Sequence, residues 1–169
     1  QVLNAVMQHP ERLGEPVSLT INYCAAMADG EFDVLARPAR TNRSTQHWVL
    51  EVLQEGQTIL TATAFTALRR DTLCSTAHAM PVVPAAMDVP EAGGPKRVEW
   101  VKRYEQRFLE GGFPARWDGS AQTSTLSRLW LRDAPPRPLD FCSLAALCDV
   151  FFPRIWLRRA TLVPIGTVS

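Results

Sequence analysis

One carboxylate interrupts an apolar stretch in the last third of the chain. Residues 141–152 are Phe-Cys-Ser-Leu-Ala-Ala-Leu-Cys-Asp-Val-Phe-Phe, and Asp149 is the one charged residue among them. A carboxylate in apolar surroundings costs free energy unless it is paired, hydrogen-bonded or at a wet opening. Two interpretations follow. Asp149 either lies near a helix end, where it reaches solvent or Arg154, or it is a general base that takes a proton from a bound water.

The other side chains with chemical potential are basic. Just beyond the apolar stretch stand Arg154, Arg158 and Arg159, which form either a solvated face or a place where the phosphates of a ligand could pass. No G-x-S-x-G motif occurs. The three histidines are His9, His47 and His78. None of them is part of a nucleophile motif or stands at metal-ligand spacing from another His or Cys. We therefore expect neither a metal nor a cofactor.

Composition limits the function classes. The 18 basic and 17 acidic residues nearly cancel, and 46% of the residues are apolar, so nothing points to nucleic acid and a real core is expected. No run approaches the roughly 18 apolar residues of a membrane span. The four cysteines contain no C-x-x-C pair, which indicates reduced thiols and a cytoplasmic protein.

The first part of the chain predicts a helix followed by strands. Residues 1–7 have apolar residues at helical spacing, and Pro10 and Gly14 end that helix. Four β-prone segments follow, at 17–27, 32–40, 45–54 and 58–68. Asp29-Gly30 and Glu55-Gly56 suit hairpin turns. We expect an antiparallel meander with the helix covering one face.

The second part repeats this plan after a Pro-rich linker at 71–96. Strands are predicted at 98–109 and 124–131, then a helix over 138–152 with Pro138 in its first turn and Pro153 at its end. Residues 161–169 are expected to start a further strand. In both parts a helix closed by Pro precedes a strand with a Val-Ser pair, Val17-Ser18 and Val168-Ser169.

This similarity indicates an internal duplication. About three strands of the second copy are then missing, and we expect the sequence to be truncated at both ends. Aligning the copies on their prolines and Val-Ser pairs places Val6 opposite Asp149 and Pro16 opposite Thr167. The first copy lacks both polar groups, so we expect it to be structural.

The order of these elements, with the helix motif Leu-Ala-Ala-Leu-Cys-Asp149 and the strand motif Gly166-Thr167-Val168-Ser169, resembles the acyl-CoA thioesterases of the thioesterase II type. The resemblance covers nearly the whole chain. It implies an α+β fold of two tandem hotdog domains, each an antiparallel sheet wrapped around a central helix. Residues 1–70 would be the first hotdog, 71–96 the linker and 97–169 an incomplete second hotdog.

The resemblance also implies an activity and its residues. Asp149 and Thr167 would activate the water that hydrolyses an acyl-CoA to a free fatty acid and CoA, with a third group, a Gln, beyond Ser169. The CoA phosphates would favour the arginines at the mouth of the site. A homodimer is implied as well. The alternatives are a non-catalytic acyl-CoA-binding module and a hydratase or dehydratase of acyl thioesters, which usually pairs an Asp with a His.

Overall fold

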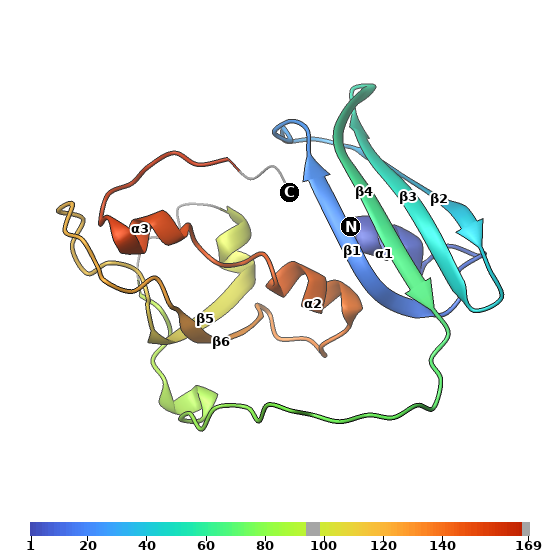
Figure 1. The fold of residues 1–169 in the computed structure, drawn as a ribbon. Helices are drawn as coiled ribbons and strands as arrows, with labels where there is room; N and C mark the ends of the chain where they lie inside the picture. Colours follow the sequence, from blue (N-terminus) through green and yellow to red (C-terminus); the bar gives the residue numbers. More distant parts are fainter. Residues whose placement is uncertain (94–98, 167–169) are drawn as a thin grey trace. The chain divides into compact units, whose positions relative to one another are not determined.

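The computed structural model describes residues 1–93 and 99–166, and the chain forms two compact units (Figure 1). The first is built on Gln1–Cys74 and the second on Ser75–Ile165. None of the helices formed by the described residues has the length and hydropathy that a bilayer crossing requires.

The first unit is one helix packed on a four-stranded antiparallel sheet. It contains α1 (Val2–Met7), β1 (Glu15–Tyr23), β2 (Asp33–Thr41), β3 (Thr45–Gln54) and β4 (Gln57–Ala67). The strand order across the sheet is β1-β4-β3-β2. The predicted helix and all four predicted strands are therefore confirmed, within a few residues at their ends.

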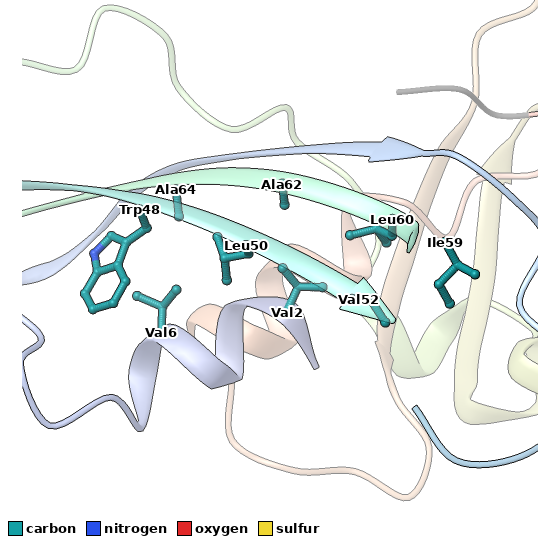
Figure 2. Close-up of a cluster of buried hydrophobic side chains, with 9 residues drawn as sticks. All are labelled: Val2, Val6, Trp48, Leu50, Val52, Ile59, Leu60, Ala62 and Ala64. Carbon is teal, nitrogen blue, oxygen red and sulfur yellow. The ribbon is translucent and has the colours of Figure 1, made fainter. Parts of the chain in front are cut away.

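The core of this unit is formed by side chains that alternate between the two faces of the sheet along each strand. Every second residue of a strand faces the same side of a sheet, and in β3 the residues Trp48, Leu50 and Val52 are all buried. Trp48 lies opposite Ala64 of β4, and Leu50 lies opposite Ala62. Helix α1 adds Val2 and Val6 to the same cluster, as Figure 2 shows. One apolar stripe of α1 thus covers one face of the sheet.

The expected meander is correct for three strands and wrong for β1. Glu55 and Gly56 form the two-residue turn between β3 and β4, both with positive φ, 50° and 75°, as a type I′ hairpin requires. Asp29-Gly30 forms no hairpin, because β1 pairs with β4 and not with β2. The connection over residues 24–32 is long enough to reach the far edge of the sheet, so nothing forces β1 to lie beside β2.

Among its described residues the second unit contains a two-stranded antiparallel sheet, two short α-helices and two 3₁₀-helices. Its elements are η1 (Ala86–Asp88), η2 (Glu99–Arg103), β5 (Tyr104–Glu110), β6 (Arg128–Asp133), α2 (Phe141–Leu147) and α3 (Arg154–Arg158). The predicted strand pair is confirmed by the pairing of β5 with β6. Residues 84–92 of the Pro-rich segment contact this sheet, where Trp130 Nε1 donates to Pro84 O at 2.9 Å and Ala92 N donates to Gln106 O at 2.7 Å.

Helix α2 is much shorter than the predicted helix over 138–152. It begins after Asp140, whose side chain accepts a hydrogen bond from Ser143 N, so Asp140 and not Pro138 sets its start. Its end at Leu147 leaves Val150 and Phe152 outside the helix, where both are buried. Phe152 stacks on Phe113, with ring centroids 4.4 Å apart. Phe152 could not make this contact if α2 continued to residue 152. Val and Phe are also weak helix formers, and the residue before a proline disfavours the helical conformation.

Two further expectations about this end of the chain differ from the structure. Pro153 begins α3 rather than ending a helix, which suits the fixed φ of proline in a first turn. The predicted strand at 161–169 is absent from its described part, residues 161–166. Residues 167–169 lie outside the described residues.

The core of the first unit generates a stability prediction. Leu50 is fully buried, so we expect Leu50→Ala to lower the free energy of unfolding by about 2–5 kcal/mol. Leu35 on β2 is 53% exposed, and Leu35→Ala should change stability by no more than about 0.5 kcal/mol. Urea denaturation followed by circular dichroism measures both. Equal effects of the two variants would contradict the assignment of Leu50 to the core.

Candidate active site

Asp149 lies in the turn that follows α2, and its side chain is exposed. Its backbone N–H donates to Ala146 O at 3.2 Å, which continues the helix by one tight turn. The next residue, Val150, is 4% exposed and fixes this turn to the interior of the unit. Asp149 is therefore held at an exposed helix end, the placement that the first of the two interpretations of the sequence expects.

Helix α2 is held to strand β6 by polar side chains that the sequence patterns did not single out. Ser143, 1% exposed, donates its hydroxyl to Asp133 Oδ2 at the end of β6. Arg137 Nε lies 2.9 Å from that same oxygen, and Arg137 Nη1 lies 2.9 Å from Asp140 Oδ2. We call Asp133, Arg137, Asp140 and Ser143 the α2 anchor.

The protonation state of Asp140 depends on these contacts. The backbone N–H of Ser143, 2.7 Å from Asp140 Oδ1, holds the pKa of the Asp140 carboxyl below its usual range, and Arg137 lowers that pKa further. A carboxylate also suits the positive end of a helix dipole. The ionised form of Asp140 therefore stabilises the start of α2.

Tyr104 lies within electrostatic range of both the α2 anchor and Asp149. It stands on β5 directly opposite Asp133 on β6. Burial raises the pKa of the Tyr104 hydroxyl, and the negative charges of Asp133 and Asp149 raise that pKa further, against a lowering by Arg137.

The three arginines predicted to bind substrate have different neighbours. Arg154 is engaged inside its unit: it donates from Nε and Nη2 to Phe152 O and from Nη1 to Ser127 Oγ. Its guanidinium carbon lies 4.3 Å from the centre of the Phe152 ring. Burial lowers the pKa of Arg154.

Arg158 and Arg159 are exposed. Arg158 Nη1 donates to the carbonyl oxygens of Gln122 and Thr123, at 2.7 and 3.0 Å. The backbone of Arg159 pairs with that of Ala121. The C-terminal end of α3 therefore holds the irregular segment at 121–123.

Thr167, the second predicted catalytic residue, lies outside the described residues, so its position relative to Asp149 stays a prediction. Among the described residues no group of three His, Cys, Asp or Glu side chains could hold a metal ion. An apolar depression of about 260 Å³ does occur in the second unit, lined by Pro90, Ala92, Gly93, Phe108, Gly112 and Phe113. Neither Asp149 nor the α2 anchor lines it.

Both parts of the chain match models of one protein family. Residues 1–67 match the acyl-CoA thioesterase N-terminal domain, and residues 79–169 match the acyl-CoA thioesterase C-terminal domain. No curated protein matches the chain.

Solved structures confirm the α+β hotdog fold. A hotdog-fold protein of unknown function from Alicyclobacillus acidocaldarius is 43% identical, with a TM-score of 0.87 over 99% of this chain and 61% of that one. An acyl-CoA thioesterase II from Mycobacterium marinum is 19% identical, with a TM-score of 0.58 over 88% of this chain and 55% of that one.

A third structure, the tesB protein of Mycobacterium avium subspecies paratuberculosis, is 15% identical with a TM-score of 0.62, over 88% of this chain and 54% of that one. At this identity the likeness concerns the fold. The chain therefore spans between about half and three fifths of the length of these three structures.

The lowered pKa of Asp140 generates a prediction about pH. Because the folded state favours the ionised carboxyl, its contribution to stability is present above the unfolded pKa and is lost as the pH falls through the folded pKa. We expect Asp140→Asn, which keeps a capping oxygen, to lower Tm at pH 7. The difference in Tm from wild type should narrow as the pH falls through and below the usual pKa range of an aspartate carboxyl. Thermal unfolding at several pH values measures it, and a difference that is independent of pH would contradict this role of Asp140.

Proposed function

The chain belongs to the acyl-CoA thioesterase family, and from this premise we propose that the protein hydrolyses acyl-CoA thioesters to a free fatty acid and CoA. The observation that carries the proposal is the match of both parts of the chain, in order, to the N-terminal and C-terminal thioesterase domains. Asp149 lies within the C-terminal match and is exposed at the end of α2. A general base that acts on water needs this kind of access.

Asp149 is the general base in this proposal. A water oxygen attacks the thioester carbonyl carbon while the Asp149 carboxylate accepts the proton of that water. The tetrahedral intermediate then collapses, the carbon–sulfur bond breaks, and the proton passes to the departing CoA sulfur. Thr167 would hold the attacking water, because a hydroxyl both donates and accepts a hydrogen bond.

The CoA phosphates would lie near the end of α3. Arg158 and Arg159 are exposed there, and arginine is well suited to bidentate binding of phosphate. Arg154 has a different part in the proposal, because it is half-buried and donates from Nε, Nη1 and Nη2 within its unit. Arg158 is exposed and donates from Nη1 to the carbonyl oxygens of Gln122 and Thr123. Arg154 would support this region and not contact the phosphates.

We place the reaction in the cytoplasm. Cys24, Cys74, Cys142 and Cys148 are free thiols, the state that a reducing compartment maintains. The assembly that we propose is a homodimer. Light scattering on the full-length protein after size-exclusion chromatography would measure its mass.

The activity test follows thiol release from a panel of acyl-CoAs by the full-length protein. We expect release of free CoA thiol, and Asp149→Asn should lower kcat/KM by about 10²–10⁴-fold, the range for loss of a general base. Thr167→Ala should lower it less. Cys148→Ser is the matched control, because Cys148 is the exposed neighbour of Asp149 in the same turn, and it should retain activity.

Other outcomes of this assay would contradict the proposal in distinct ways. Binding of acyl-CoA without thiol release would indicate a non-catalytic binding module. A changed acyl chain with CoA still attached would indicate a hydratase or dehydratase. Full turnover by folded Asp149→Asn would exclude Asp149 as the base while leaving the activity intact.

A further inference from the structure

A serine is the one buried polar side chain of α2. Ser143 is 1% exposed, and Leu147, the last residue of α2, lies one turn later on the same helix face. Apolar residues would fill such a face without the cost of burying a hydroxyl. The hydroxyl of Ser143 instead donates to Asp133 Oδ2 on β6, so this face carries a directional contact to the sheet.

The acceptor of this hydrogen bond is itself fixed. The Asp133 side chain is 14% exposed, and Arg137 Nε lies 2.9 Å from its Oδ2. Arg137 also contacts Asp140 at the start of the same helix. Hydrogen bonds to ionised groups are stronger than neutral ones and hold a preferred geometry. The contact between Ser143 and Asp133 therefore fixes how far α2 is rotated about its axis relative to β6.

Backbone hydrogen bonds connect Asp149 to the helix that contains Ser143. Cys148 N donates to Leu144 O at 3.1 Å, and Asp149 N donates to Ala146 O at 3.2 Å, so backbone hydrogen bonds run from the helix into the turn. Asp149 comes six positions after Ser143 and two after the last residue of α2, about 9 Å along the helix axis. A rotation of α2 would consequently move the Asp149 carboxylate as well.

We infer that the hydrogen bond between Ser143 and Asp133 is a positioning device for Asp149, and that Ser143 and Asp133 are positioning residues of the thioesterase site. This inference rests on the proposed function of Asp149. A misplacement of about 1 Å at a reacting group can lower a rate about 100-fold. Loss of the hydrogen bond should therefore reduce turnover more than it reduces substrate binding.

The test compares folded variants of the full-length protein in the thiol-release assay. Ser143→Ala should lower kcat by about tenfold to 100-fold with KM changed less than about threefold, after normalisation to the folded fraction measured by circular dichroism. Ser143→Thr keeps the hydroxyl and should recover most of the turnover. Should Ser143→Ala not fold, Asp133→Ala, which removes the acceptor of the Ser143 hydroxyl, should show the same split between kcat and KM.

The matched control is Thr66→Val in the first unit. Thr66 is also fully buried and also uses its hydroxyl in a bond to another side chain, accepting from Trp48 Nε1 at 3.2 Å. Thr66→Val should lower Tm without changing kcat. This control separates the general cost of losing a buried hydrogen bond from an effect on the site.

A double variant distinguishes positioning from simple destabilisation. If Ser143 acts through Asp149, then Ser143→Ala should slow turnover no further in an Asp149→Asn background. Equal slowing in both backgrounds, or wild-type kcat in folded Ser143→Ala, would overturn the positioning role. Absence of thiol release by the wild-type protein would instead overturn the proposed function, and retained activity in Asp149→Asn alone would exclude Asp149 as the base, so the three failures are distinguishable.

Discussion

The contact between α2 and β6 is the constraint on which the candidate site depends. A seven-residue helix is too short to be stable by itself, so α2 persists because the unit holds it. Asp140 caps its first turn, and Ser143 joins its buried face to Asp133. Val150 secures the turn beyond its end. Asp149 takes its position from these contacts and contributes none of the burial that maintains them.

The first unit also holds a short helix against its sheet, but it does so with apolar side chains. Helix α1 packs on its sheet through Val2 and Val6, and Val6 is fully buried. Val6 is also the residue that the alignment of the two helices places opposite Asp149. The helix of the first unit thus packs into a closed core, whereas the helix of the second unit ends at a polar, exposed turn. This contrast supports our assignment of the chemistry to the second unit.

The sequence predicted what depends on local pattern and not what depends on distant partners. Alternating apolar residues located all four strands of the first sheet, but strand order is a property of pairing, and β1 pairs with β4. The apolar run at 141–152 suggested one long helix because its pattern contains no break. The break comes from Phe152, which stacks on Phe113, 39 residues earlier. Asp140 caps α2 by accepting from the backbone N–H of Ser143, three residues later, and an Asp at that spacing before a helix is a pattern that the sequence contains. The contact of Ser143 with Asp133 has no signature in the sequence.

The central claim is that Asp149 faces the thioester of a bound acyl-CoA. A crystal structure of the full-length protein with a non-hydrolysable acyl-CoA analogue tests it most directly. Our account predicts a water within about 2.6–3.2 Å of an Asp149 carboxylate oxygen, with the reacting carbon of the analogue on the other side of that water and Thr167 beside it. An analogue bound with its reacting carbon remote from Asp149, while that carboxylate faces bulk solvent, would contradict the account.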